Sequence, residues 1–467
     1  MTDANERPRV AVVLAAGKGT RMRSNRPKVL HEAAGRPLLA WVVDAARQAG
    51  CSKILIVVGH GAEQVREVIQ GEDIGWVLQA EQRGTGHALA QVEGHVDGPA
   101  TLLVLSGDVP LVTPVTLDQL ASEAEAGWGA MAVAELDHPG SLGRVITTPE
   151  GRLHRIVEAR DAEPEQLAVR RINAGLYALP APDIFDGLRG LTTNNAQGEL
   201  YLTDAVTNAA RARKSVRLVS LTNPDEALGV NNRAELARIH RLLVERHLEA
   251  LMESGVTILE PARTLIEPGV RVGLDTVIHP DVSLLGQTEI GPCCVLHQGA
   301  WLHDSRIGED VTILPYSVLD RVEVGDGCRV GPFARLRPAS RLLRGARVGN
   351  FVEVKSSVLG EGAKVGHLAY VGDATVGDGA NVGAGVVTCN YDGERKNPTE
   401  IGAGAFVGSD TMLVAPVRVG AGAMTAAGSV ITKNVPDGAL AVGRVRQKNL
   451  AGRSGGLRRS GAGNENP

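Results

Sequence analysis

The sequence feature that most constrains the fold is a six-residue spacing of aliphatic side chains in the second half of the chain. The spacing holds without a break at Val324, Val330, Leu336, Leu342, Val348 and Val354. It returns in shifted phase at Ile307 and Ile313, Val365 and Val371, Val376 and Val382, and Ile401, Val407, Leu413 and Val419. Hexapeptide repeats of this kind predict a parallel β-helix, in which a rung of three short strands spends about eighteen residues and points one aliphatic side chain inward per strand.

Glycine often follows the aliphatic residue, as in Val330-Gly331 and Val407-Gly408. Glycine supplies the backbone freedom that each corner of a rung needs. An ordinary β-sandwich is the alternative, but it would alternate every two residues and turn every eight to twelve or so. Six positions in one phase favour the β-helix.

Length and composition limit the rest of the chain. At 467 residues it is too long for a single core of ordinary size, so we expect two or three domains. A net charge of -4 gives no general attraction to nucleic acid. The five cysteines form an odd set without a C-x-x-C pair, which favours neither a disulfide framework nor a zinc site and suits a reducing cytoplasm.

Neither a secretory signal nor an integral membrane segment is expected. The apolar run from Val10 to Ala16 is followed by Gly17-Lys18-Gly19-Thr20-Arg21 and not by a small-residue cleavage site. We interpret that run as a buried first strand. No stretch reaches the ~18 apolar residues that a membrane helix needs.

The first part of the chain alternates short apolar runs with helical patterns, which predicts an α/β domain with a parallel, Rossmann-like sheet covered by helices. Expected strands are 10–16, 54–58, 102–105, 130–136, 143–147, 153–157 and 172–179, and expected helices are 38–49, 64–70 and 200–212. Ligands of such sheets bind beyond the carboxyl ends of the strands.

The predicted domains are a nucleotide-binding domain over 1–233, a helical linker over 234–254, a β-helix over 255–452 and a tail over 453–467. Apolar residues at three- and four-residue steps, such as Leu236, Ile239 and Leu243, give the linker one apolar stripe. The six-residue period fails between Thr388 and Glu400, which predicts a functional loop. The tail has no apolar pattern and is expected to be disordered.

A glycine-rich loop follows the first expected strand in the string LAAGKGTRM. Its backbone amides can approach phosphate, while Lys18 and Arg21 supply positive charge. The string is neither the Walker A pattern nor the dinucleotide fingerprint. By itself it could also be a plain strand-to-helix turn.

The longer string LAAGKGTRM...RPKVL resembles the sugar-1-phosphate nucleotidyltransferases. Further motifs follow in that family's order: QAEQRGTGHA from Gln79, SGDVPL from Ser106, GRV from Gly143, IVE from Ile156, NAG from Asn173 and GVNNR from Gly229. Together with the repeats and with RLRP, GNFVEVK, GHLAYVGD and TCNYDG, they resemble the bifunctional bacterial N-acetylglucosamine-1-phosphate uridylyltransferase / glucosamine-1-phosphate N-acetyltransferases. The resemblance covers Val10 to Arg444 and implies a β-helix of left hand.

The resemblance implies a UTP and UDP-sugar site in the first domain, with uracil contacts on Gln79 and the Gly84-Thr85 backbone. The sugar contacts would fall on Gly143, Glu158 and Asn173. The expected residues of the whole site are Leu14, Ala15, Gly17, Lys28, Gln79, Gly84, Thr85, Ser106, Gly107, Asp108, Gly143, Glu158, Asn173 and Asn231. Asp108 and Asn231 would hold Mg²⁺, which prefers oxygen ligands, and Arg21 and Lys28 would act catalytically on the phosphates. For a lone Asp108 the alternative is a turn or N-cap carboxylate.

A second site is implied in the β-helix. His367 would be the general base, since imidazole can take a proton from an amine near neutral pH. Arg337, Lys355, Tyr370 and Asn381, with Glu353 beside them, would bind the acetyl acceptor, and Ala384, Asn390, Tyr391, Ser409, Ala427 and Arg444 would bind acetyl-CoA. Taken singly, each of these polar residues could also be ordinary solvated surface.

The implied protein is a cytoplasmic homotrimer that acts on small molecules: UTP, acetyl-CoA, glucosamine 1-phosphate and N-acetylglucosamine 1-phosphate. Its product would serve as a precursor of peptidoglycan and lipopolysaccharide. One alternative is a single-activity sugar-1-phosphate nucleotidyltransferase whose β-helix only assembles or regulates it. Another is a non-catalytic nucleotide sensor, which the presence of Lys28, Asp108 and Asn231 disfavours.

Overall fold

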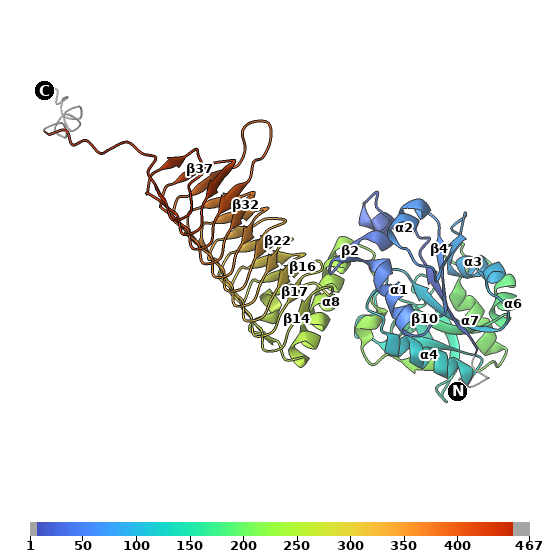
Figure 1. Cartoon of the computed structure of the whole chain (residues 1–467). Helices are drawn as coiled ribbons and strands as arrows, with labels where there is room; N and C mark the ends of the chain where they lie inside the picture. Colours follow the sequence, from blue (N-terminus) through green and yellow to red (C-terminus); the bar gives the residue numbers. More distant parts are fainter. Residues whose placement is uncertain (1–6, 452–467) are drawn as a thin grey trace, which may run out of the picture. The chain divides into compact units, whose positions relative to one another are not determined.

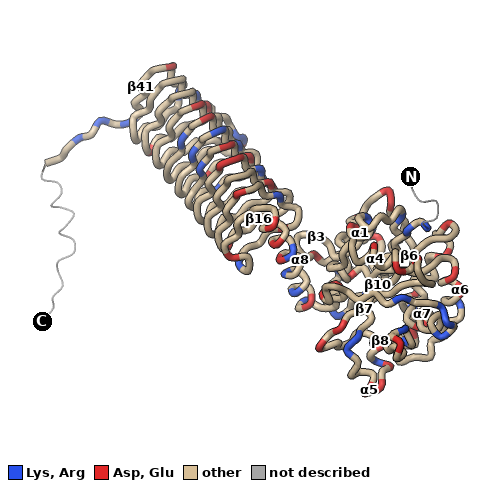
Figure 2. Tube along the Cα trace, turned by 90° about the horizontal axis from the view of Figure 1, so that it is seen from below, with Lys and Arg blue, Asp and Glu red and all other residues tan. Residues whose placement is uncertain are grey.

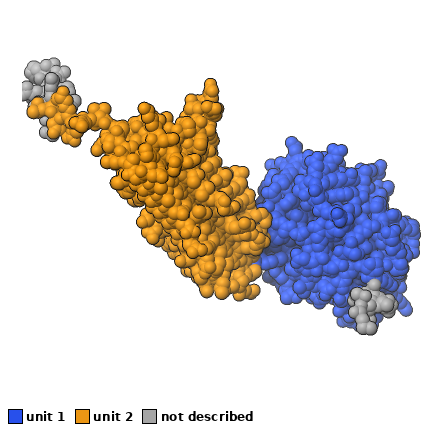
Figure 3. All heavy atoms as spheres, viewed as in Figure 1, with its two compact units in different colours: residues 1–246 blue, residues 247–467 orange. Residues whose placement is uncertain are grey.

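The computed structural model describes residues 7–451, in two compact units that comprise residues 1–246 and 247–467 (Figure 3). The expected tail over 453–467 lies outside the described residues. None of the helices that the structure describes is both long enough and apolar enough to cross a bilayer.

The first unit is built on a nine-stranded sheet with the order β11-β7-β10-β6-β1-β4-β5, to which β8 and β9 attach at β10. Its strands are β1 (Arg9–Leu14), β4 (Lys53–Val58), β5 (Ile74–Leu78), β6 (Ala100–Ser106), β7 (Gly129–Glu135), β8 (Arg144–Thr147), β9 (Leu153–Val157), β10 (Arg171–Ala181) and β11 (Val216–Ser220). A separate hairpin pairs β2 (Glu32–Ala33) with β3 (Arg36–Pro37).

Helices cover this sheet. They are α1 (Leu38–Gln48), α2 (Ala62–Val68), α3 (Thr85–Ala90), α4 (Pro114–Glu125), α5 (Pro164–Leu167), α6 (Asp183–Arg189) and α7 (Leu202–Arg211). One core cluster joins α1 and α4 to one face of the sheet, and a second joins α3, α6 and α7 to the other. Both faces of the central strands are therefore buried, which is why these strands read as continuous apolar runs.

Every strand and helix expected in the first domain is present, with ends that differ by a few residues. The first strand ends at Leu14, so Ala15 and Ala16 already belong to the loop. The sequence pattern missed the strands β2, β3, β5 and β11 and the helices α3, α4, α5 and α6. Strands β1, β4, β5 and β6 pair in parallel, whereas β10 pairs antiparallel with both β6 and β7.

A long helix, α8 (Arg233–Glu253), follows the first sheet. Ile239, Leu243 and Leu251 of the expected apolar stripe are buried, whereas Leu236 is only partly buried. Leu248, outside the expected stripe, is also buried.

The second unit is a parallel β-helix made of three sheets (Figure 1). The first sheet contains β12 (Thr257–Ile258), β15 (Val277–Ile278), β18 (Val295–Leu296), β21 (Thr312–Ile313), β24 (Arg329–Val330), β27 (Arg347–Asn350), β30 (Lys364–His367), β33 (Asn381–Val382), β36 (Phe406–Val407), β39 (Met424–Thr425) and β41 (Leu440–Ala441). The second contains β13 (Leu265–Ile266), β16 (Ser283–Leu285), β19 (Trp301–His303), β22 (Val318–Asp320), β25 (Arg335–Leu336), β28 (Glu353–Lys355), β31 (Tyr370–Gly372), β34 (Val387–Cys389), β37 (Met412–Val414) and β40 (Val430–Ile431). The third contains β14 (Arg271–Val272), β17 (Glu289–Ile290), β20 (Arg306–Ile307), β23 (Glu323–Val324), β26 (Arg341–Leu342), β29 (Val358–Leu359), β32 (Ala374–Val376), β35 (Thr399–Ile401) and β38 (Val417–Val419).

The six aliphatic residues of the unbroken repeat point into this β-helix, since none of their side chains is more than 3% exposed. Val330 pairs with Val348 across one rung of eighteen residues, and Val348 pairs with Val365 across one of seventeen. A rung that is one residue shorter moves every later aliphatic position by one. This variation explains why the spacing returns in shifted phase along the sequence.

The loop expected between Thr388 and Glu400 leaves the regular stack near β37 (Figure 1). An isolated bridge joins Tyr391 to Lys396, and the side chain of Asp392 closes the tip. Its carboxylate accepts hydrogen bonds from the amides of Glu394 at 2.9 Å and Arg395 at 2.8 Å. These bonds lower the pKa of Asp392 to about 2.

Candidate active sites

The glycine-rich loop begins where β1 ends, at the carboxyl edge of the parallel strands. Leu14 pairs with Ser106 at the end of β6, so the loop and the SGDVPL motif meet at one edge. The amide of Gly107 donates to the carbonyl of Leu14 at 3.0 Å. Gly19 takes φ 59°, where a Cβ would come within 2.7 Å of the Lys28 side chain. Glycine is therefore needed there for both backbone conformation and space.

A cavity of about 290 Å³ opens at this edge. Nine of the residues expected to bind the nucleotide line it: Leu14, Ala15, Gly17, Lys28, Gln79, Gly84, Thr85, Ser106 and Asp108. Gln82 and Glu199 also line it, and no sequence signal had singled them out for a role. Residues from four separate motifs thus converge on one cavity.

Gln79 is 3% exposed, and its Nε2 donates to the carbonyl of Gly84 at 3.2 Å. Gly84 has φ 105° and lies against the backbone of Leu200. A side chain at this position would collide with that backbone. Gln79 and Gly84, two of the residues expected to contact uracil, are therefore fixed relative to each other.

The residues expected to contact the sugar form a second group. The amide of Asn173 donates to the carbonyl of Gly143 at 2.9 Å, and Gly143 faces the carboxylate of Glu158. Thr203 donates to that carboxylate at 3.0 Å. Burial raises the pKa of Glu158 despite this bond, and the charges of Asp161 and Asp204 act in the same direction. Glu158 also lines a pocket of about 400 Å³ with Tyr201 and Thr203.

The expected metal ligands come together beside the glycine-rich loop. The amide of Val230 donates to the carbonyl of Asp108 at 3.0 Å, which brings the neighbouring Asn231 to the same place. Lys28 pairs with Asp108, and the guanidinium of Arg21 donates to the amide oxygen of Asn231 at 2.8 Å. The carboxylate of Asp108 and the amide oxygen of Asn231 thus each bind a cationic side chain.

Within residues 7–451 no cluster of three or more His, Cys, Asp or Glu side chains is placed to hold a metal. One carboxylate and one amide oxygen nevertheless fit a hard cation that takes few protein ligands and fills its remaining positions with phosphate oxygens and water. The donor set is compatible with the expected cation.

Three of the four expected acceptor-binding residues lie on or directly after neighbouring strands of the second sheet of the β-helix: Arg337, Lys355 and Tyr370. Arg335, Glu353 and Tyr370 pair in register, and the guanidinium of Arg337 donates to Glu353 at 2.8 Å. Asn381 lies on the first sheet, in register with Lys364.

Lys355 has a neighbour that the sequence did not reveal. The nearby ammonium of Lys396 lowers the pKa of Lys355, and desolvation and the charge of Arg337 act the same way, while the carboxylate of Asp373 opposes them. Lys396 comes from the loop, which therefore reaches the acceptor residues. An excess of positive charge at this place suits a phosphate group.

His367 and three of the expected acetyl-CoA residues share one corner of the β-helix. His367 ends β30, and Ala384, Ser409 and Ala427 occupy the equivalent position after β33, β36 and β39. Backbone bonds tie successive corners together: Asp410 donates to Ala384 at 2.7 Å and Gly428 to Ser409 at 2.8 Å. We call this row of positions the corner column.

The other three residues expected to bind acetyl-CoA lie outside the corner column. Asn390 is 7% exposed; its amide donates to Tyr370 Oη at 3.4 Å and also bonds Asp373. Tyr391 is 62% exposed, and its hydroxyl bonds the loop carbonyl of Gly393. Arg444 lies beyond β41 and is exposed.

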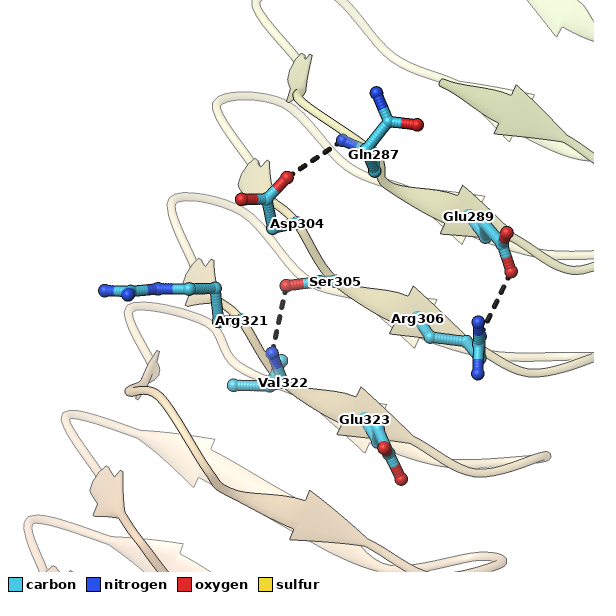
Figure 4. Close-up of a pocket in the computed structure, with 8 residues that line it drawn as sticks. All are labelled: Gln287, Glu289, Asp304, Ser305, Arg306, Arg321, Val322 and Glu323. Carbon is cyan, nitrogen blue, oxygen red and sulfur yellow. Dashed lines mark hydrogen bonds and ion pairs between the residues drawn. The ribbon is translucent and has the colours of Figure 1, made fainter. Parts of the chain in front are cut away.

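Another cavity of about 260 Å³ lies on the β-helix and is lined by none of the expected residues (Figure 4). Its polar groups bond one another between rungs. The amide of Gln287 donates to Asp304 at 2.9 Å, that of Val322 donates to Ser305 at 3.3 Å, and Arg306 pairs with Glu289 at 3.0 Å. We interpret these bonds as contacts that stabilise the stacking of the rungs.

Comparison with known proteins agrees with this division of the chain. Residues 11–258 match the family model of the MobA-like NTP transferase domain, and residues 304–338 match that of the bacterial transferase hexapeptide. The Bifunctional protein GlmU of Pelobacter propionicus is 46% identical over 446 residues, covering 95% of this chain and 97% of that protein. The protein of the same name from Pelotomaculum thermopropionicum is 52% identical over 441 residues, covering 94% and 96%.

The chain belongs to the bifunctional GlmU family. This membership confirms the resemblance drawn from the sequence and the predicted fold, a nucleotidyltransferase domain followed by a left-handed β-helix. It also confirms an enzyme that combines a nucleotidyltransferase with a hexapeptide acetyltransferase. The single-activity alternative disagrees with relatives that are named bifunctional over the whole length of the chain.

GlmU membership further implies small-molecule sugar phosphate and nucleotide substrates and the use of a divalent metal.

Proposed function

We propose that the chain makes UDP-N-acetylglucosamine in two steps, one in each unit. Acetyl transfer from acetyl-CoA to glucosamine 1-phosphate would take place on the β-helix. Uridylyl transfer from UTP to the resulting N-acetylglucosamine 1-phosphate would take place in the first unit. The observation that supports this assignment best is the convergence of four separate sequence motifs on the cavity at the end of β1 and β6.

In the uridylyl step, a phosphate oxygen of N-acetylglucosamine 1-phosphate attacks the α-phosphorus of UTP, and the bond to pyrophosphate breaks. The reaction needs no covalent intermediate on the protein. Gln79 and Gly84 orient the base, while Gly143, Glu158 and Asn173 orient the sugar. Lys28 and Arg21 counter the negative charge on the phosphates, since positioning and electrostatics dominate transfers of this kind. Asp108 and Asn231 would hold Mg²⁺, which when bound neutralises phosphate oxygens.

In the acetyl step, the amine of glucosamine 1-phosphate attacks the thioester carbonyl of acetyl-CoA. His367 takes the proton of the attacking amine, the carbon–sulfur bond breaks, and the CoA thiolate leaves and is protonated. Arg337 and Lys355 bind the acceptor phosphate, as a planar fork and a point charge respectively. Tyr370 and Asn381 contact the sugar.

The small side chains of Ala384, Ser409 and Ala427 leave room along the corner column beside His367, which suits an extended ligand such as acetyl-CoA. Asn390 and Tyr391 would meet this ligand from the loop, and Arg444 would meet a CoA phosphate.

We further propose a cytoplasmic homotrimer with domain limits at 1–233, 234–254 and 255–452. An exposed apolar row on the β-helix supports self-association. Tyr316, Phe333 and Phe351 stack with ring centroids 5.4 and 5.3 Å apart, and Leu368 continues the row. Each of these side chains is 48–62% exposed, and such contiguous apolar surface often marks an interface.

One reaction mixture tests the function. The protein is supplied with glucosamine 1-phosphate, acetyl-CoA, UTP and Mg²⁺, and free CoA thiol and pyrophosphate are measured. We expect both products, with pyrophosphate appearing only when acetyl-CoA is present. Pyrophosphate without CoA release would contradict the assignment of the two steps.

A further inference from the structure

The corner column carries one polar side chain next to His367 whose role the sequence did not reveal. Asn350 ends β27 and pairs in register with His367 on β30. Its Oδ1 lies 2.6 Å from Nδ1 of His367. The amide of Leu368 also donates to the carbonyl of Asn350 at 3.1 Å, so backbone and side chain both fix the two corners.

This contact has a chemical consequence for the imidazole. An amide oxygen can only accept a hydrogen bond, so a partner at Nδ1 must carry a proton there. A neutral imidazole then has its free lone pair at Nε2. Only one of the two neutral tautomers satisfies the contact, and that tautomer leaves Nε2 free to accept a proton.

We propose that Asn350 is a positioning residue for acetyl transfer: it holds His367 in the Nδ1–H tautomer and turns Nε2 toward the amine of the acetyl acceptor. The inference rests on the proposed function, in which His367 is the base. It extends that function to a residue that lies one rung away and touches no reacting atom.

The residues at the other positions of the corner column support this role. Pro315 and Pro332 occupy the two preceding rungs, and Ala384, Ser409 and Ala427 the three rungs after His367. Within these rungs, only Asn350 offers His367 an amide partner from the neighbouring corner. The charged groups on the strands next to the imidazole are Lys364 on β30 itself and Arg347 on β27, while β33 contributes the neutral Asn381.

A merely structural bond between two exposed corners would give different results from a positioning bond. Replacing Asn350 with Leu keeps similar bulk and removes the acceptor. We expect kcat of acetyl transfer to fall roughly tenfold, as for loss of one hydrogen bond, while KM for acetyl-CoA stays within about twofold. Uridylyl transfer should be unchanged.

Asn350→Asp restores an acceptor but adds a negative charge. A carboxylate favours the protonated imidazole, so more alkaline solution is needed to free the base. We expect the acid limb of the kcat profile to move to higher pH by about one unit or more, with kcat returning toward wild type above it. A structural role would leave the profile in place.

Gln298 provides a matched control, because it occupies the same corner column and its amide bonds Asp281 on the preceding rung at 3.0 Å. Gln298→Leu should leave kcat and its pH profile unchanged. Melting curves and light scattering of every variant establish that the fold and the assembly are retained.

Two results would overturn the inference alone: an Asn350→Leu enzyme with kcat within twofold of wild type while His367→Ala is slow, or an Asn350→Asp profile that does not move. Near-wild-type acetyl transfer by His367→Ala would instead show that His367 is not the base. That result would contradict both the proposed acetyl step and this inference.

Discussion

At the scale of single residues, the two candidate sites balance their charges differently. In the first unit, Lys28 pairs with Asp108 and Arg21 bonds Asn231, so each cation has an oxygen partner. In the β-helix, Arg337 pairs with Glu353, but Lys355 contacts another lysine, Lys396. We interpret the first arrangement as suited to a metal with phosphates, and the second as suited to a phosphate alone.

Asp108→Ala tests the first arrangement. The change removes the carboxylate that would hold the divalent cation, so we expect UDP-sugar formation to fall at least ~100-fold while acetyl transfer is unaffected. Asp118→Ala serves as the control, because Asp118 forms only an exposed ion pair with Arg9 in the same unit. Equal loss of both activities in folded Asp108→Ala protein would contradict the assignment.

Glu158 gives a prediction about pH. Burial raises the pKa of its carboxyl in the folded state, so the ionised form is disfavoured there relative to the unfolded chain. Below the unfolded pKa of ~4.3 the carboxyl is protonated in both states, so its burial costs no stability. The folded state loses stability as the pH rises from there through the raised pKa of the folded state. Glu158→Gln removes the charge and keeps an oxygen for Thr203. Its melting temperature should exceed that of wild type at pH 8, with the difference vanishing near pH 4.

The same variant should raise KM for N-acetylglucosamine 1-phosphate, because the carboxylate is proposed to bind the sugar. A wild-type KM together with an unchanged melting temperature at pH 8 would contradict both predictions. It would show that the Glu158 carboxylate neither destabilises the fold nor binds the sugar.

At the scale of elements, the loop that leaves the β-helix is held by its own side chains. Asp392 bonds the amides of Glu394 and Arg395 and the side chain of Asn397. Asn390 and Lys396, on either side of this turn, reach Tyr370 and Lys355 on the rungs. The loop thus links residues expected to bind acetyl-CoA with those expected to bind the acceptor.

Asp392→Ala should loosen this loop without unfolding the β-helix. We expect faster trypsin cleavage after Arg395 or Lys396, slower acetyl transfer and unchanged uridylyl transfer. Glu394→Ala is the matched control, since its amide and not its carboxylate makes the bond to Asp392. Equal cleavage rates in wild type and Asp392→Ala would argue against an ordering role.

The sequence alone predicted the elements whose pattern depends on burial. The six-residue spacing located the β-helix because each strand must point one aliphatic residue inward, and β1, β4 and β6 were found because both of their faces are covered. Strand β5 escaped because Ile74, Gly75 and Trp76 are only partly buried and give no clear pattern.

The sequence predicted site residues only where they lie within a motif that resembles the known family. The contacts of Lys355 with Lys396 and of His367 with Asn350 were missed for a physical reason. They depend on how rungs of seventeen and eighteen residues stack and on where the loop folds back, and neither is visible in local spacing.

At the scale of the whole molecule, the β-helix displays both signs of charge along its rungs (Figure 2). The apolar row from Tyr316 to Leu368 interrupts this polar surface. An exposed row of four large apolar side chains is costly in water unless another surface covers it. A second copy of the chain is the occupant we propose.

The trimer prediction follows from this row and from the resemblance drawn from the hexapeptide repeats. Light scattering at micromolar concentration should give three times the chain mass of 49.0 kDa. A protein lacking residues 1–233 should still form trimers, because the contacts are placed on the β-helix. A monomer of single-chain mass at this concentration would count against the assembly.

The central claim is that the chain carries two separate activities joined by a released intermediate. Complementation between His367→Ala and Asp108→Ala tests it most directly, with UDP-N-acetylglucosamine measured from glucosamine 1-phosphate, acetyl-CoA, UTP and Mg²⁺. We predict almost no product from either variant alone, since loss of a general base costs ~10²- to 10⁴-fold and loss of the metal carboxylate stops the second step. An equal mixture should form product, because Asp108→Ala supplies the acetylated sugar phosphate that His367→Ala consumes. Failure of the mixture with both proteins folded, or full product from one variant alone, would contradict the account.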